Sequence, residues 1–258
     1  MKHASLEKVN IGGTHFSNVS LEETMEIFSE AIENHAKKRV CVIPVNCIVW
    51  AAENKALQDI YNSADLSLCD GVPILWMSKL LGTPLKGRVT GLDLLPLFTE
   101  ICAKRNYSVF LLGAKPGVGT QLAASFQKNY PNLDICGIYT PPMSASFSAE
   151  ENQHMIELIN AAAPDIVWVS LSAPKQDYWI AEHFDKLNAT IVIGVGGAFE
   201  VSAGLIARAP KWMQKSGLEW LFRFTQEPKR LFHRYFIEAP RILSIIVKQL
   251  LSRKDNQA

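Results

Sequence analysis

Short apolar runs alternate with amphipathic segments along most of the chain, and this alternation restricts the fold more than any other feature. The runs are rich in β-branched residues, as in Ile166–Val169, which is typical of buried strands. The sequence predicts strands at 40–43, 66–69, 108–112, 134–138, 166–171 and 190–193, and helices at 48–61, 91–105, 150–163 and 176–187, with another ending near 129. Such alternation predicts an α/β fold: a Rossmann-like, mainly parallel sheet flanked by helices.

The chain has 258 residues, enough for one large domain or for one domain with an appendage. No apolar run is long enough to span a bilayer, and the polar N-terminus lacks the apolar core of a signal peptide. The cysteines are dispersed without metal-binding spacing, which predicts reduced, buried thiols in a cytoplasmic protein. They are Cys41, Cys47, Cys69, Cys102 and Cys136.

The C-terminal segment differs from the rest of the chain in charge. Residues 208–258 contain eleven Lys or Arg and four Asp or Glu, a net charge of +7, so residues 1–207 carry about −6 of the total of +1. Aromatic residues are interleaved with these bases, and 242–251 has helical spacing. Basic, aromatic-rich amphipathic helices suit an anionic membrane surface. We therefore expect an α/β core at 1–207 and an appendage at 208–258 that faces the membrane and the acceptor.

The composition of this basic segment is also compatible with roles away from a membrane. A helical cap packed on the sheet, or on a second copy of the chain in a homo-oligomer, would also need amphipathic helices. Nucleic acid could satisfy the charge, but the sequence contains no recognisable nucleic-acid-binding motif, and we expect no such partner.

Polar side chains follow several predicted strands at the point where each strand ends. Asp70 follows 66–69, and Gln176 lies in the polar segment Ser172–Asp177 after another predicted strand. Open α/β sheets bind ligands at the carboxyl ends of their strands. A carboxylate there can take a proton from an attacking hydroxyl, although an Asx turn or helix cap is the structural alternative. The Gln176 segment is either a recognition loop or a solvated turn.

Two glycine-rich turns also follow predicted strands. Gly113–Gly119 fits neither the Walker pattern nor the dinucleotide fingerprint, and Gly194–Gly197 is equally ambiguous. Such turns can bind a phosphate at a helix N-terminus or simply allow close packing. The chain has no D-x-D motif and its six histidines are dispersed, so we expect neither a metal nor another cofactor.

Taken together and in order, these segments resemble the WecG/TagA/CpsF family, glycosyltransferase family 26. The resemblance extends from about Asn10 to Tyr235. The matching motifs are Asn46, Asp70-Gly71, Arg88–Gly91, Gly113–Val118, Pro174–Asp177, Gly194–Phe199, Ala203-Gly204, Arg208–Pro210, Glu219–Arg223, Glu227–Arg230 and Arg234-Tyr235. Each motif is weak by itself, but their combination is specific.

The resemblance implies an inverting, metal-independent enzyme that transfers a sugar from a UDP-sugar to an undecaprenyl-diphosphate-linked saccharide at the cytoplasmic side of the membrane, in cell-envelope polysaccharide biosynthesis. The implied general base is Asp70. The implied donor-binding residues are Asn46, Arg88, Thr90, Gly113, Lys115, Gln176, Asp177, Gly196 and Gly197. The basic residues implied to hold the acceptor diphosphate or the membrane are Arg208, Arg223, Arg230 and Arg234.

Several residues depart from the family pattern. Pro44 replaces a usual Thr, Asp177 a Glu and Glu200 an Asp, while Ser170 and Ala173 stand where glycines are common. These changes surround the predicted site and leave the exact sugar open. The resemblance implies N-acetylmannosamine, its uronic acid or glucuronic acid. Two other classes of function are a Rossmann-type nucleotide-binding oxidoreductase and a non-catalytic membrane adaptor.

Overall fold

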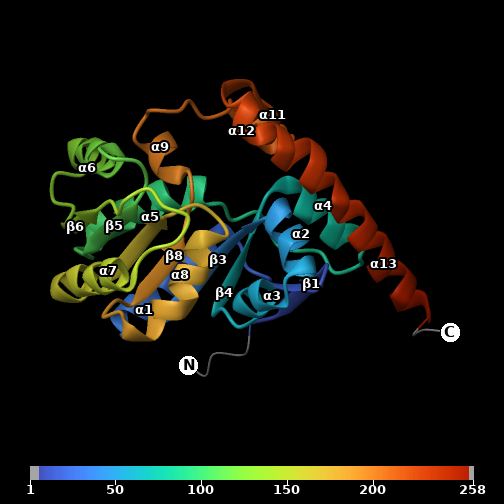
Figure 1. The fold of residues 1–258 in the computed structure, drawn as a ribbon, viewed down its shortest axis with the longest axis horizontal. Coiled ribbons are helices and arrows are strands. Elements are labelled where there is room, and N and C mark those ends of the chain that lie inside the picture. Colours follow the sequence, from blue (N-terminus) through green and yellow to red (C-terminus); the bar gives the residue numbers. More distant parts are fainter. Residues whose placement is uncertain (1–5, 256–258) are drawn as a thin grey trace.

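A six-stranded, entirely parallel sheet forms the centre of the protein, in the order β4-β3-β8-β7-β5-β6 (Figure 1). The computed structural model describes residues 6–255, with side chains through residue 252. The strands are β3 (Lys38–Pro44), β4 (Leu66–Asp70), β5 (Val109–Gly113), β6 (Ile135–Tyr139), β7 (Ile166–Ser170) and β8 (Ile191–Gly194). All six predicted strands are present, and the predicted α/β fold is confirmed.

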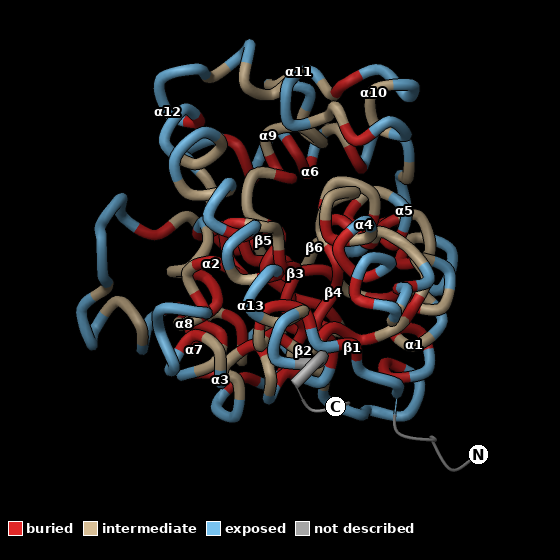
Figure 2. Tube along the Cα trace, turned by 90° about the vertical axis from the view of Figure 1, so that its right-hand side faces the viewer, coloured by how far each residue is buried: buried red, intermediate tan, exposed pale blue. Residues whose placement is uncertain are grey.

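Helices cover both faces of the sheet, so the central strands are buried on both sides, as their continuous apolar sequences require. Figure 2 shows this burial along the trace. One face is covered by α1 (Leu21–Glu33), α5 (Gly91–Arg105), α6 (Val118–Asn129) and α9 (Ala198–Ser202). The other is covered by α2 (Val45–Glu53), α3 (Lys55–Asn62), α4 (Val72–Leu80), α7 (Ala149–Ala162) and α8 (Lys175–His183), which continues into a 3-10 turn (Phe184–Lys186).

The structure corrects the predicted single helix at 48–61. The chain forms α2 and α3 instead, and they separate at Asn54, whose backbone is extended. The Asn54 side chain accepts a hydrogen bond from the backbone N–H of Leu57 at 3.1 Å, so it caps the second helix. An N-terminal hairpin, β1 (Lys8–Ile11) and β2 (Thr14–Ser17), was not predicted. All five cysteines are free, and four of them are buried as predicted, whereas Cys136 is only partly buried.

The C-terminal segment runs from the carboxyl edge of the sheet down one side of the molecule (Figure 1). It contains α10 (Lys211–Lys215), α11 (Glu219–Gln226), α12 (Pro228–Phe232), the π-helix η2 (His233–Glu238), the 3-10 turn η3 (Ala239–Arg241) and α13 (Ile242–Asp255). Ile242 and Ile246 are buried in the core cluster that α2 and α4 share. Gln249 accepts a hydrogen bond from Gly12 N at 2.8 Å and donates one to Asn10 O at 2.9 Å.

These contacts hold α13 on the α/β unit. No helix within residues 6–255 combines the length and the hydropathy that a membrane-crossing segment needs.

Candidate active site

A pocket of about 1060 Å³ lies at the carboxyl ends of β3, β4, β7 and β8. The C-terminal segment forms its opposite wall through α11, α12 and η2. This edge is where open α/β sheets bind their ligands. The volume is at the upper end of the roughly 300–1,000 Å³ found for small-molecule sites, so the pocket has room for a large ligand or for parts of two.

Asp70, the last residue of β4, places its carboxylate in this pocket. Burial raises the pKa of Asp70 to about 6, although Arg88, Arg234 and Arg223 act in the opposite direction. Among the described residues, no side chain or backbone N–H donates a hydrogen bond to this carboxylate. It is therefore a free acceptor that is largely ionised at neutral pH, and its pKa suits a general base.

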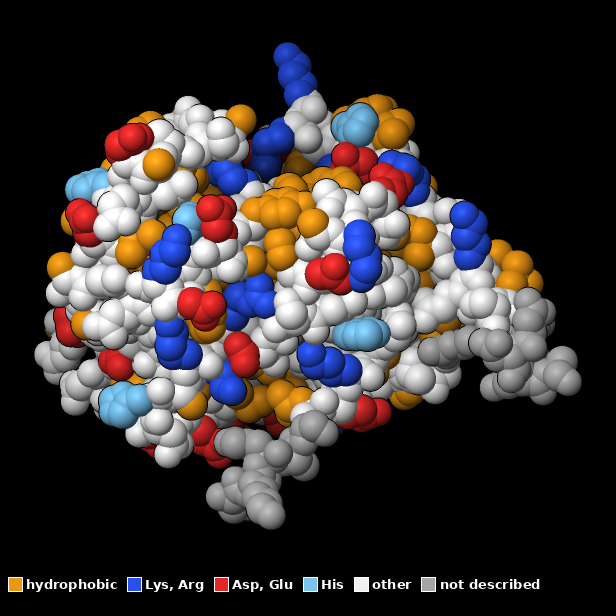
Figure 3. Space-filling model, turned by 60° about the horizontal axis from the view of Figure 1, so that its bottom comes forward, with side chains coloured by type: hydrophobic (Ala, Val, Ile, Leu, Met, Phe, Trp, Pro, Cys, Tyr) orange, Lys and Arg blue, Asp and Glu red, His pale blue; other side chains and the backbone are white. Residues whose placement is uncertain are grey.

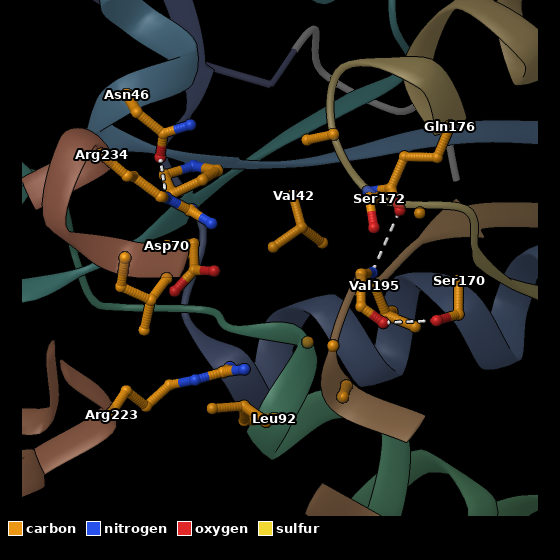
Figure 4. A pocket seen from close by; sticks show the side chains of 18 of the residues that line it. Val42, Asn46, Asp70, Leu92, Ser170, Ser172, Gln176, Val195, Arg223 and Arg234 are labelled. Atoms are coloured by element: carbon orange, nitrogen blue, oxygen red, sulfur yellow. Dashed lines mark hydrogen bonds between the residues drawn. The ribbon is translucent and has the colours of Figure 1, made fainter. Parts of the chain in front are cut away.

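Arg234 and Arg223 approach Asp70 from the C-terminal segment (Figure 4). Arg234 Nε donates a hydrogen bond to Asn46 Oδ1 at 2.9 Å, which joins η2 to the first turn of α2. Arg223 Nη2 lies 3.7 Å from Glu227 Oε2, and its buried Nε has no partner among the described residues. The guanidinium groups of these two arginines therefore retain donors that can bind an anion.

Arg230 also lines the pocket but is more exposed and more fully paired. Its side chain is 55% exposed, and it forms a two-pronged ion pair with the Glu227 carboxylate, with Nε at 2.8 Å from Oε1.

Arg88 and Arg208 form a closed ring of ion pairs with Asp93 and Glu219. Arg88 donates to Glu219 at 2.8 Å and to Asp93 at 3.1 Å. Arg208 donates to Asp93 at 2.5 Å and to Glu219 at 3.2 Å, and also to the Leu92 carbonyl at 3.1 Å. Because Glu219 opens α11 and Asp93 lies in α5, the ring fixes α11, and with it Arg223 one turn later, onto the core.

Gln176, in the first turn of α8, is almost fully buried and shapes one wall of the pocket. Its Oε1 accepts a hydrogen bond from Gly196 N at 3.1 Å (Figure 4). Ser170 Oγ donates to Gly196 O at 2.7 Å, so both polar atoms of this residue's backbone are held. A Cβ on Gly194 would lie 2.6 Å from Gln176 Nε2, which explains the glycine at the end of β8.

Asp177 points away from the pocket, although it adjoins Gln176. Its Oδ2 accepts a hydrogen bond from the buried Tyr61 hydroxyl at 3.2 Å, whereas its buried Oδ1 has no partner among the described residues. Burial raises the pKa of Asp177 to about 7, and the Tyr61 hydrogen bond offsets only part of this increase. The ionised carboxylate therefore destabilises the contact between α8 and α3.

We expect Asp177→Asn to stabilise the fold at pH 8. The pKa of Asp177 is raised in the folded chain, so between about pH 3.8 and 7 the folded chain keeps this proton and the unfolded chain loses it. The free energy of unfolding therefore falls as the pH rises through this window. Removing the charge should raise the free energy of unfolding at pH 8 by up to about 4 kcal/mol, with little gain at pH 4. Urea unfolding at both pH values measures this, and exposed Asp185→Asn is the control. Equal gains at both pH values would contradict it.

The other glycine turn brings Lys115 to the pocket. Gly113 has φ +103, and a Cβ there would lie 2.5 Å from Ser170 O, so only glycine fits beside β7. Lys115 follows in the turn before α6 and lines the pocket, whereas Gly113 itself does not.

Thr90 likewise lies outside the pocket lining. Its hydroxyl accepts a hydrogen bond from Asp93 N at 3.1 Å and donates one to Asp93 Oδ2 at 3.0 Å, so it caps α5 and holds the ion-pair ring.

The structure brings most of the predicted site residues together. Those that line the pocket are Asn46, Asp70, Arg88, Lys115, Gln176, Gly196, Gly197, Arg223, Arg230 and Arg234. Four others support its walls instead: Thr90, Gly113, Asp177 and Arg208. Within residues 6–255, no three His, Cys, Asp or Glu side chains converge closely enough to hold a metal ion.

Two parts of the pocket lie outside the predicted set of binding residues, although Glu200 is one of the departures from the family pattern. Glu200 lines the pocket from the first turn of α9, and its buried Oε2 has no partner among the described residues. The loop 141–147 forms another wall, held where Lys175 Nζ donates to Ser144 O at 2.8 Å and lies 4.3 Å from the Phe147 ring centroid. Glu200 directly follows the Gly-Gly-Ala-Phe motif, and this position is a sequence signal that can identify it as a pocket residue. The loop has no such signal.

Comparison with known proteins identifies the family of this chain. Residues 9–256 match the family model described as the glycosyl transferase WecG/TagA/CpsF family. The chain is also similar to two curated proteins named N-acetylglucosaminyldiphosphoundecaprenol N-acetyl-beta-D-mannosaminyltransferase, from Staphylococcus aureus strains MRSA252 and NCTC 8325. Each is 27% identical to it over 232 residues, which cover 89% of this chain and 89% of the relative. The chain therefore belongs to the WecG/TagA/CpsF family of glycosyltransferases.

Proposed function

We propose that this glycosyltransferase moves a sugar from a UDP-sugar to a saccharide linked to undecaprenyl diphosphate, with inversion at the anomeric carbon. The observation that carries the proposal is Asp70: a free carboxylate with a raised pKa, facing a pocket that also contains unsatisfied guanidinium donors. Because the chain belongs to a family of glycosyltransferases, it is an enzyme. The two alternative functions, a nucleotide-binding oxidoreductase and a non-catalytic membrane adaptor, gain no support from this membership.

The proposed reaction is a single displacement. The acceptor hydroxyl gives its proton to Asp70 as its oxygen attacks the anomeric carbon of the donor. The bond between that carbon and the β-phosphate oxygen breaks, and UDP leaves with the electron pair. Because the nucleophile enters opposite the leaving group, the configuration inverts. A carboxylate with a pKa of about 6 is ionised at neutral pH yet more basic than an exposed aspartate, as the first step requires.

The pocket offers separate groups for the two diphosphates. We place the leaving UDP at Lys115, beside the Gly194–Gly197 turn, because a cation can stabilise developing phosphate charge. We assign the acceptor diphosphate to Arg223, Arg230 and Arg234, because guanidinium groups bind phosphate oxygens bidentately. In this arrangement Gln176 keeps the Gly196 backbone in place for the donor.

The sugar is proposed from the relatives. Both Staphylococcus aureus proteins are named as N-acetyl-beta-D-mannosaminyltransferases, so UDP-N-acetylmannosamine is the first donor to test. The corresponding uronic acid and glucuronic acid follow, since Glu200 and Pro44 differ from the family pattern inside the pocket.

We further propose that residues 208–258 act as an appendage that holds the enzyme at the inner face of the cell membrane, where a lipid-linked acceptor is available. Basic and apolar side chains alternate along this segment. Phe232, Phe236 and Leu243 are exposed there, which suits insertion into an anionic interface.

The enzymatic proposal is tested by UDP release. The full chain is incubated with UDP-N-acetylmannosamine, its uronic acid or UDP-glucuronic acid, with and without N-acetylglucosaminyl diphosphate carried on a polyprenyl chain. We expect one donor to release UDP in proportion to the acceptor added. If no donor supports acceptor-dependent release, the proposal is wrong.

The membrane proposal predicts a second result. Leu243→Ser combined with Val247→Ser should reduce sedimentation of the full chain with phosphatidylglycerol-containing vesicles by about ten-fold or more, because two exposed apolar side chains are removed from α13. The control is Ile138→Ser, which changes an exposed apolar residue on β6, at the far edge of the sheet. Equal binding of all three proteins would contradict the role of the appendage.

A further inference from the structure

The helix α4 of the α/β unit exposes large apolar side chains to solvent. Trp76 is 57% exposed and Leu80, one turn later, is 64% exposed. The opposite side of α4 is buried, with Ile74 and Met77 in the core. The helix is therefore apolar on both sides, although an ordinary surface helix has a polar outer face.

The helices α4 and α13 both pack on one core cluster, and each also exposes apolar side chains. Met77 of α4 and Ile246 of α13 belong to the same buried cluster, so the two helices cover one part of the core. Both lie on the side of the molecule that faces the viewer in Figure 2. On its outer side α13 exposes Leu243 (66%) and Val247 (54%), spaced one helical turn apart.

Trp76 also lies at the rim of the pocket. A Cβ placed on Gly217 would lie 3.4 Å from the Trp76 ring and 3.1 Å from Val72, and both Gly217 and Val72 line the pocket. On the other side of the pocket, Leu243 is itself a lining residue. The apolar side chains of α4 and α13 thus flank the active site.

We propose that α4 is a second membrane anchor: Trp76 and Leu80 insert into the same anionic bilayer as α13 and turn the active site toward it. This inference rests on the proposed function, which places the appendage at the membrane, and extends the contact to a helix outside that appendage. Tryptophan favours the boundary between headgroups and acyl chains. Exposed Lys79 and Lys248 stand beside the apolar residues, where their stems can reach the headgroups.

The lysines also argue against a second protein as the partner, because the centres of protein interfaces are depleted of lysine. On the face shown in Figure 3, basic, acidic and histidine side chains are interspersed with hydrophobic ones.

The test compares the full chain with Trp76→Ala combined with Leu80→Ala, and with Ile138→Ala as the matched control on β6. Vesicles contain equal parts of phosphatidylglycerol and phosphatidylcholine. We expect the double variant to bind about ten-fold more weakly and the control to bind within about two-fold of wild type. Brominated lipids should quench wild-type tryptophan fluorescence more than that of Trp76→Phe. Circular dichroism checks that each variant is folded.

The outcomes are distinct. If wild type binds vesicles and the double variant binds equally well, the role of α4 is refuted while the appendage proposal stands. If the wild-type protein is a dimer in solution, and the double variant is a monomer that binds vesicles as well as wild type, the surface is a contact between copies of the chain. That result would refute the inference. If wild type does not bind vesicles, the membrane part of the proposed function fails and α4 fails with it, while acceptor-dependent UDP release still tests the enzymatic part.

Discussion

Asp70→Asn should lower kcat by about 10²–10⁴-fold while leaving donor binding nearly unchanged, because the amide keeps the shape of the carboxylate but cannot accept the hydroxyl proton. The effect should be on kcat because the proton is transferred in the chemical step, not during binding. Steady-state UDP release at saturating donor and acceptor measures it, and calorimetric titration with UDP measures binding.

The pH dependence identifies the group that titrates. Because burial raises the pKa of Asp70 to about 6, wild-type kcat/KM should fall as the pH drops through that value and the carboxylate takes up a proton. The residual activity of Asp70→Asn should lack this acid limb. Asp59→Asn, at an exposed carboxylate on α3, is the control and should keep the wild-type profile. An Asp70→Asn enzyme with more than about a tenth of wild-type turnover would rule out the base assignment.

Arg234→Met should lower kcat/KM for the lipid-diphosphate acceptor by roughly ten- to hundred-fold, because a hydrogen bond to a charged group contributes about 1.5–3 kcal/mol. Methionine retains the apolar stem and removes all five N–H donors. The loss should appear mainly in the acceptor KM, measured with the donor saturating. Arg234→Lys should recover little of the loss, since an ammonium group cannot form the bidentate contact.

Arg241→Met is the matched control. Arg241 lies in the same segment and also pairs with a carboxylate, that of Glu53, but it is exposed and does not line the pocket. Its replacement should leave the acceptor KM within about two-fold of wild type, because exposed ion pairs contribute little. Similar losses in both variants would show that general basicity, and not a diphosphate site, causes the effect.

The strands were predictable because a parallel strand buried on both faces needs an uninterrupted apolar run, as Ile166–Ser170 has. The division of the predicted helix 48–61 could not be predicted, because Asn54 is also tolerated in the interior of a helix. Its capping hydrogen bond with Leu57 depends on the extended backbone at Asn54, which only the structure shows. The packing of α13 was equally hidden, since an amphipathic helix suits a protein core and a membrane alike.

The site was predictable where a residue ends a strand, as Asp70 does, because the sheet itself brings such residues together. The direction in which each side chain points could not be predicted. Adjacent residues of a helix point about 100° apart, and only the structure shows that Lys175 and Gln176 line the pocket while Asp177 turns toward Tyr61. The pairing of Arg88 with Glu219, 131 residues later, depends on how α11 docks and has no local signal.

The most direct test of catalysis by Asp70 is the anomeric configuration of the product formed from an α-linked UDP-sugar. We predict acceptor-dependent release of UDP and a β-linked product detected by NMR, since an acceptor hydroxyl activated by Asp70 attacks in one displacement. A product with retained α configuration, or UDP release that does not depend on the acceptor, would contradict this mechanism.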